Sequence, residues 1–157
     1  MADPFPDLRT LSPAQLVEQL AHRSAVRRRE AQAELLHRGN SDEVDVLLKT
    51  AIAKTDTPLY GRVAQLFTLV QLMGAASHPV IAPWVDDADL REFVLRALVD
   101  RDSQIDNVNP RAFVDALTDP NPRVRVQAAI GLGRLRDPSL AEKLVPLTAD
   151  KDWNVRH

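Results

Sequence analysis

The stretch LTDPNPRVR at residues 117–125 is echoed by LTADKDWNVR at residues 147–156. Three positions match at a common spacing of 31 residues: Asp119 with Asp150, Val124 with Val155, and Arg125 with Arg156. A fixed period of this size is typical of stacked supersecondary units, each of which buries its apolar face against the next one. Such stacks present extended surfaces. The repeat therefore predicts an architecture more directly than it predicts a reaction.

The same pattern can be traced toward the N-terminus. Asp56 stands six residues before Arg62, and Asp86 stands five residues before Arg91. The first unit keeps an arginine, Arg27, but has Ala21 where the aspartate is expected. Small or aliphatic residues follow the arginines at helical spacing, as in Ala128, Ala129, Leu132 and Leu135. We therefore expect about four full units and the beginning of a fifth.

Composition narrows the class of protein. The chain has 157 residues, enough for one domain with a continuous core. Hydrophobic residues make up 45% and aromatic residues 4%, which favours closely packed aliphatic helices over a β-sandwich. A net charge of −2 gives no global attraction to nucleic acid, and the lack of cysteine excludes disulfides and thiolate chemistry. No apolar run approaches the ~20 residues that span a bilayer, so no membrane insertion is expected.

Prolines and small polar residues mark where the helices are expected to begin. Pro4 and Pro6 block helix formation, so residues 1–11 are predicted to form an extended N-terminal arm. Helices are expected over 13–21, 24–39, 58–74, 90–99 and 110–117, with others starting at Ser41, Asn121 (the longest regular helix) and Pro138. Pro83 and Pro146 predict short or kinked helices. The expected fold is all-α, a right-handed α-α superhelix of about four to five helical hairpins over residues 12–157.

The unit from Asp119 to Leu135 has the pattern DxNPRVRxxAAxxLGxL. It resembles the HEAT repeat in the short form named after phycobilisome lyases, and the likeness extends over almost the whole chain. The resemblance implies that the aspartate of each unit caps its second helix and that the arginine joins a ladder of side chains between neighbouring units. The implied ladder residues are Asp56, Arg62, Asp86, Arg91, Asp119, Arg125, Asp150 and Arg156.

A narrower resemblance concerns the order of the segments. The stretches PDL at residues 6–8, LSPAQLV at residues 11–17 and ADLR at residues 88–91 are similar to the HEAT region of large exported dehydrogenase-like proteins of planctomycete-type bacteria. In those proteins a quinoprotein-like β-propeller precedes the repeats, and a cytochrome c segment often follows. Their catalytic and haem motifs are absent from these residues. The resemblance therefore implies a bracing role next to a catalytic domain.

The final residues, WNVRH at 153–157, begin a helix that the repeat predicts to continue. A natural solenoid ends in a polar-faced capping unit. We therefore expect an excised domain or a truncated product. Its last apolar face, with Leu144, Leu147 and Trp153, favours end-to-end self-association.

Few residues suggest catalysis or metal binding. His22, His37, His78 and His157 lie in different units, so none forms a helical metal-binding pair. Asp86, Asp87 and Asp89 could hold a cation, but carboxylates at a helix start are more simply explained as caps. Ser24 and Ser139 have no evident base, and the GLG motif at residues 131–133 is expected to allow close helix packing. We expect no enzyme activity and no cofactor.

A basic run in the first unit is the strongest candidate for binding nucleic acid. It comprises Arg23, Arg27, Arg28, Arg29 and Arg38. Residues 27 and 28 diverge by about 100° on a helix, so the run wraps around the helix, and Glu30 and Glu34 lie within ion-pairing reach. A solvated face is therefore favoured over a nucleic-acid-binding HEAT-like repeat.

These observations predict a non-catalytic HEAT-repeat scaffold that binds a protein partner or another domain of its parent chain. The bracing module and the nucleic-acid-binding repeat remain as alternatives. Binding is expected on the exposed side of the second helices, at Arg28, Gln65, Gln71, Arg96, Gln127 and Arg134. The sequence does not assign a cellular compartment. We expect the cytoplasm by default, and the periplasm if the parent protein is an exported dehydrogenase-like protein.

Overall fold

The computed structural model describes residues 4–156. Every regular element within these residues is an α-helix or a short 3-10 helix, and no strand occurs among them. The all-α prediction is therefore confirmed. The chain divides into two compact units, Met1–Ser77 and His78–His157.

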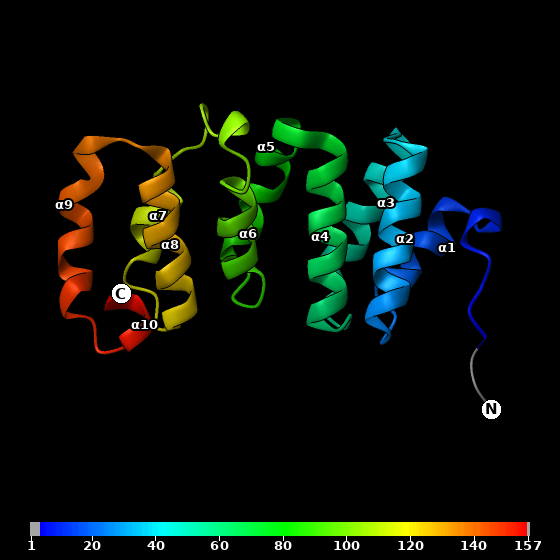
Figure 1. Ribbon diagram of the computed structural model, residues 1–157, viewed down its shortest axis with the longest axis horizontal. Coiled ribbons are helices and arrows are strands. Elements are labelled where there is room, and N and C mark those ends of the chain that lie inside the picture. Colours follow the sequence, from blue (N-terminus) through cyan, green and yellow to red (C-terminus); the bar gives the residue numbers. More distant parts are fainter. Residues whose placement is uncertain (1–3, 157) are drawn as a thin grey trace. The chain divides into compact units, whose positions relative to one another are not determined.

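The first unit is built from two helical pairs, α1 with α2 and α3 with α4. Its elements are η1 (Leu8–Thr10), α1 (Pro13–Gln19), α2 (Ala25–Arg38), α3 (Asp42–Ala53), α4 (Leu59–Met73) and η2 (Gly74–Ser77). Helix α1 also packs on α3, and α2 packs on α4, so the first and second helices form separate layers (Figure 1). The core between them is aliphatic, as predicted, with Leu16, Leu20, Leu35, Leu48, Ile52, Leu66 and Leu69 buried.

Local sequence accounts for the ends of these helices. Ser12 forms a capping box with Gln15, and Ser24 and Ser41 cap α2 and α3 through their side-chain oxygens. Helices α2 and α4 end at Gly39 and Gly74, whose φ angles of 82° and 58° suit glycine. The predicted boundaries are thus close to the observed ones. Helix α4, with 15 residues, is longer than the helix expected to be the longest, which has 14.

The second unit has shorter and less regular first helices. Its elements are α5 (His78–Ile81), η3 (Ala82–Asp86), α6 (Arg91–Leu98), η4 (Asp102–Gln104), α7 (Arg111–Ala116), α8 (Pro122–Leu135), η5 (Pro138–Leu140), α9 (Ala141–Leu144), η6 (Val145–Ala149) and α10 (Trp153–Arg156). Pro83 and Pro146 lie in the 3-10 segments η3 and η6, where short helices were expected. Helix α8 is central, because α6, α7 and α10 all pack on it.

The buried ring of Phe113 fills the contact between α7 and α8. A Cβ atom added at Gly131 would overlap the ring atoms Cδ1 and Cε1 of Phe113. A Cβ added at Gly133 would meet no other described atom within 4 Å. The expectation that the GLG motif allows close packing is therefore confirmed for Gly131 and wrong for Gly133.

One helical stretch within the described residues, Leu59–Asp86, is long and apolar enough to cross a membrane, since a window of 18 residues in it has a mean hydropathy of 1.3. The expectation that no apolar run approaches this length was therefore too strong. The core helix of a soluble protein has the same length and composition. In α4, which opens this stretch, Leu66 and Leu69 serve as core residues and Arg62 is buried among them. The stretch therefore does not show membrane insertion.

Candidate interaction surface

Arg125 of α8 makes the best-defined polar contact in the second unit. Its Nε and Nη2 atoms donate to Oδ2 and Oδ1 of Asp150, each at 2.7 Å. Its Nη1 atom donates to the backbone oxygen of Asp119 at 2.7 Å. The Arg125 and Asp150 side chains are only 6% and 10% exposed. This bidentate pair therefore ties α8 to the turn that precedes α10.

Arg91 of α6 repeats the arrangement one helical pair earlier. Its Nη1 atom pairs with Oδ2 of Asp119, and its Nε atom donates to the backbone oxygen of Val85 at 2.7 Å. Oδ1 of Asp119 accepts the backbone N–H of Asn121, just as Oδ1 of Asp150 accepts that of Asp152, both at 2.8 Å. Each aspartate therefore both holds its own turn and receives the preceding arginine. Asp119 uses one oxygen for each contact, whereas Arg125 reaches both oxygens of Asp150.

These contacts shift the pKa values of the Arg125–Asp150 pair in the direction of the charged forms. The hydrogen bond from Arg125, with that from the Asp152 backbone, lowers the pKa of Asp150. The hydrogen bond to Asp150 raises the pKa of Arg125. Both groups are therefore ionised across the physiological pH range.

The aspartates do not cap the second helices in the way that the resemblance implied. The N-cap of α8 is Asn121, whose side chain accepts the Arg123 N–H, so Asp119 lies two residues before the cap. Before α6 the side chain that accepts backbone N–H groups is that of Asp87, from Asp89 and Leu90. Asp86 contributes only its backbone oxygen, to Arg91 at 3.5 Å.

The first unit departs from this pattern at Asp56 and Arg62. The N-cap of α4 is Pro58, which offers no side-chain oxygen, and Asp56 is exposed. Arg62 is buried and donates through Nε to the backbone oxygen of Ile52 at 2.8 Å. Asp56 therefore does not act as the cap of α4.

Arg28, not Arg27, occupies the repeated arginine position of the first helical pair. Its Nη1 atom donates to the backbone oxygen of His22, six residues earlier, at 2.8 Å. Arg125 and Arg156 make the same contact with Asp119 and Asp150, also six residues earlier. Arg28 also lies over the Tyr60 ring at 4.6 Å from its centre, whereas Arg27 donates to the Pro4 oxygen at 2.7 Å. Counting four residues from the N-cap Ser24, as from Asn121 to Arg125, would have identified Arg28.

The predicted binding residues differ in exposure. Gln71, Arg96 and Arg134 are exposed, and Arg28 and Gln127 are partly exposed. The expectation is wrong for Gln65, which is 3% exposed. Its Nε2 atom donates to the Val17 oxygen at 3.5 Å, and its Oε1 atom has no hydrogen-bond partner within the described part of the chain. Gln65 therefore faces the neighbouring helix α1 and is not available to a partner.

The second helices of the second unit share a hollow of about 280 Å³ on their exposed side. It is lined by Glu92, Pro122, Arg123, Val126, Gln127, Asp152 and Asn154. Arg123 and Glu92 form an ion pair across it at 2.9 Å. On α8, Ile130 is 45% exposed, and Arg134 donates to the Val99 oxygen at 2.6 Å. The surface therefore combines charged, amide and apolar groups on helices that the arginines hold in place.

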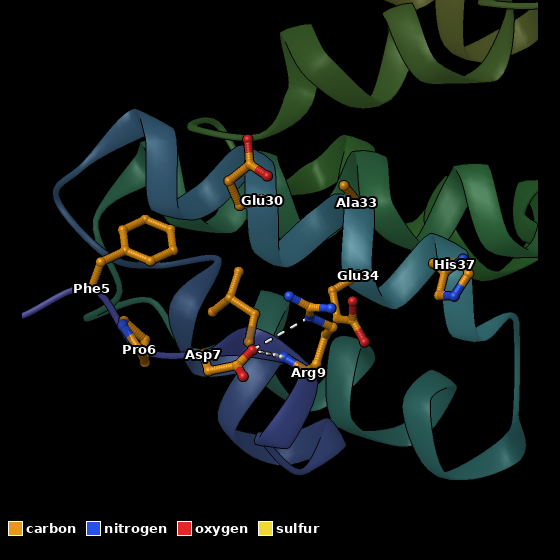
Figure 2. A pocket seen from close by; sticks show the side chains of 9 residues that line it. Phe5, Pro6, Asp7, Arg9, Glu30, Ala33, Glu34 and His37 are labelled. Carbon is orange, nitrogen blue, oxygen red and sulfur yellow. Dashed lines mark hydrogen bonds and ion pairs between the residues drawn. The ribbon is translucent and has the colours of Figure 1, made fainter.

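The first unit has a different groove, of about 400 Å³, between the N-terminal arm and α2. Figure 2 shows Phe5, Pro6, Asp7 and Arg9 of the arm facing Glu30, Ala33, Glu34 and His37 of α2. Arg38 holds the arm by donating to the Leu11 and Leu8 oxygens at 2.8 and 3.0 Å. Leu8 is buried as a result, although η1 makes the arm less extended than predicted.

Metal and nucleic-acid sites gain no support from the described residues. Within them no group of three or more His, Cys, Asp or Glu side chains is placed to hold a metal ion. Burial lowers the pKa of His78, which favours its neutral form, and His157 lies outside the described residues. In the basic run, Arg29 and Arg38 pair with Glu30 and Glu34 at 3.0 and 2.8 Å.

Comparison with known proteins supports a HEAT-repeat protein. The family model of HEAT repeats matches residues 110–157, the region from α7 to α10 that includes Arg125 and Asp150. No curated protein matches the chain. HEAT repeats generally serve as protein-interaction scaffolds and are typically non-catalytic.

Proposed function

We propose that this chain is a non-catalytic scaffold that holds a protein partner, or another domain of its parent protein, on the exposed side of α6, α8 and α10. The observation that carries the proposal is the hollow lined by Arg123, Gln127 and Asn154, which lies over helices joined by arginine–aspartate contacts. A surface held rigid before binding loses little conformational entropy when a partner arrives. Such a surface suits recognition better than it suits chemistry.

The composition of the hollow indicates the kind of partner. Val126 in the hollow offers apolar contact, and so does the exposed Ile130, four residues further along α8 and outside the lining. Arg123, Glu92 and Gln127 offer hydrogen bonds. Protein interfaces combine an apolar centre with a polar rim in this way. We therefore propose a folded or helical protein segment as the ligand, with Gln127, Arg96 and Arg134 contributing contacts at the rim.

We also propose a specific form of the HEAT repeat and a kind of parent protein. The DxNPRVR pattern supports the short HEAT form named after phycobilisome lyases. The resemblance of residues 6–17 to exported dehydrogenase-like proteins supports a bracing role, which would be the interdomain version of the same function. If the bracing role is correct, the sequence that adjoins these residues in the parent gene should encode a propeller or a cytochrome motif.

A nucleic-acid-binding function is less well supported. Arg27 and Arg28 donate to backbone oxygens, and Arg29 and Arg38 pair with glutamates. These four arginines of the basic run, which suggested nucleic-acid binding, therefore already make contacts within the protein. Retention on a polyanion column at low salt would support this alternative, and elution without retention would remove it.

The test of the scaffold proposal is affinity capture from a lysate of the native organism with the full chain as bait. Ile130→Glu places a charge on the proposed surface and should abolish capture of the specific partner, because a buried unpaired charge is costly at an interface. Val46→Glu is the matched control: it adds the same charge at an exposed aliphatic residue of the first helix α3. Partners that both variants retain equally would contradict the assigned surface.

A further inference from the structure

We propose that a hollow at the loop edge of the second unit binds an arginine side chain that a partner protein presents next to an apolar residue. The hollow measures about 400 Å³. It lies where the connection from α6 to α7 meets the connection from α8 to α9, and Figure 1 shows both connections at the upper edge of this unit. It shares no lining residue with the hollow on the second helices. The inference therefore goes beyond the proposed function, and either can fail without the other.

Apolar side chains form part of the wall of this loop-edge hollow. Ile105, Val108 and Pro110 come from the connection before α7, and Leu135 and Leu140 come from the end of α8 and from η5. All five are half-buried, so each keeps some carbon surface in contact with solvent. A long side chain can lay its methylene groups along such a wall while its charged end stays near water.

The charged groups of the lining are mostly acidic. Asp102, Asp106 and Asp137 supply three carboxylates, whereas Arg136 supplies the one guanidinium of the lining. Two negative charges are therefore in excess at neutral pH. A cationic group gains from this excess, and an acidic segment is repelled by it.

Arg136 shows how a guanidinium pairs with this rim. Its Nη2 atom donates to Oδ2 of Asp102 at 2.7 Å, which joins the end of α8 to η4. The pair forms although the two side chains are 73% and 61% exposed. A carboxylate of this rim can therefore be reached by an arginine that approaches from solvent.

The other two carboxylates have acceptor atoms without a partner in the described part of the chain. Oδ1 of Asp137 accepts the N–H and the hydroxyl of Ser139 at 2.9 and 2.7 Å, whereas no described residue donates to its Oδ2 atom. The hydrogen bond from the Ser139 hydroxyl, with that from its backbone N–H, lowers the pKa of Asp137 and favours the charged form. Asp106 is exposed, and no described residue pairs with its carboxylate.

These features suit an arginine better than a lysine or a metal ion. A guanidinium can donate two parallel hydrogen bonds to one carboxylate, and it is more weakly hydrated than an ammonium group. Arginine is also enriched at protein interfaces, where lysine is depleted. Among the described residues no group of three or more acidic or histidine side chains is placed to hold a metal ion. The apolar wall accounts for the apolar residue that we expect next to the arginine.

The test is a titration of the full chain, labelled with ¹⁵N, with two synthetic peptides. The first peptide is acetyl-GSGLRLGSG-amide. In the second, citrulline replaces the arginine, which keeps the shape of the side chain and removes its charge. Amide spectra report both the place of binding and the dissociation constant. The arginine peptide should shift the signals of residues 102–110 and 135–140, and the citrulline peptide should bind about two- to five-fold more weakly, the scale of an exposed ion pair.

Two variants should change the affinity for the arginine peptide in opposite directions. Asp106→Asn combined with Asp137→Asn should weaken it to that of the citrulline peptide, and an asparagine at position 137 can still accept the Ser139 N–H. Arg136→Gly releases the carboxylate of Asp102, and glycine suits the φ angle of 54° at this position. This variant should bind the arginine peptide about two- to five-fold more tightly than wild type.

Asp42→Asn combined with Glu43→Gln is the matched control. These two exposed residues lie in the first turn of α3, so the control removes the same amount of charge in the other unit. It should leave the affinity unchanged. The proposal is overturned if both peptides bind equally, or if the arginine peptide at millimolar concentration shifts no signal of the loop-edge hollow. It is also overturned if the folded Asp106→Asn, Asp137→Asn variant binds the arginine peptide as tightly as wild type does.

Discussion

Replacing Gly131 with alanine should destabilise the protein, whereas the same replacement at Gly133 should stabilise it. Both glycines lie in α8, two residues apart, so the intrinsic gain from glycine to alanine is about 0.8–1 kcal/mol in a helix interior and less near its end. At Gly133 no other described atom lies within 4 Å of the new Cβ, so the gain is kept. We expect G133A to raise the free energy of unfolding by about 0.5–1 kcal/mol.

At Gly131 the new methyl group would overlap the ring of Phe113, which is fully buried and cannot swing into solvent. Overpacking of a well-packed core costs about 1–3 kcal/mol. The new Cβ would lie far inside the contact distance of two ring atoms, so the upper part of this range applies, about 2–3 kcal/mol. After subtraction of the helix gain of about 1 kcal/mol, G131A should lower the free energy of unfolding by about 1–2 kcal/mol. The two alanine variants should therefore differ by about 1.5–3 kcal/mol.

Urea unfolding followed by far-UV circular dichroism measures this difference, with the m-value checked to be unchanged. Phe113→Leu in the G131A background makes room for the methyl group and should recover part of the loss. Equal stability of G131A and G133A, or a more stable G131A, would refute the idea that ring contact with Gly131 sets the spacing of α7 and α8.

Two further predictions concern the polar groups. Pairing with Arg125 lowers the pKa of Asp150 in the folded state. The pair therefore stabilises the protein fully at a pH above the ordinary carboxyl pKa of 3.8. This stabilisation is lost as the pH falls through the lowered pKa of Asp150 in the folded protein. The difference in urea midpoint between wild type and Asp150→Asn should therefore be largest at pH 7 and should shrink below pH 3.8. A difference that stays constant down to pH 2.5 would contradict the pairing. Gln65→Met should raise the free energy of unfolding by up to about 1 kcal/mol, because it removes a buried oxygen without a partner at the cost of one long hydrogen bond. If thermal unfolding shows that this variant is less stable than wild type, the Gln65 amide contributes more to stability than its buried oxygen costs.

The positions of the helices could be read from the sequence because their signals are local. Ser12, Ser24 and Ser41 each satisfy a backbone N–H within three residues, and Gly39 ends α2 in a conformation that other residues avoid. The period of 31 likewise placed Arg125 and Arg156 in equivalent positions. Each of these features depends on residues that are close together in the chain, so neighbouring helices have little influence on it.

The surface residues were predicted less well. Helical periodicity placed Gln65 on an exposed face, but α2 and α3 both pack on α4, and Gln65 itself donates to Val17 of α1, so little of the circumference of α4 remains free. The repeat period assigned Arg27 to the arginine position of the first unit, because a shift of one residue hardly changes a spacing of more than thirty. The hydrogen bond from Arg28 to His22 shows the correct position.

The sequence by itself determined that the chain is helical, where its helices begin and end, and that its units repeat. Only the tertiary structure decided which arginine meets which carboxylate, and that Gly131 and not Gly133 lies against a ring. The physical reason is that capping and turn energies arise within a few residues. The ion pairs of Arg91 and Arg125 depend on aspartates that lie 25 or more residues away and that only folding brings within reach.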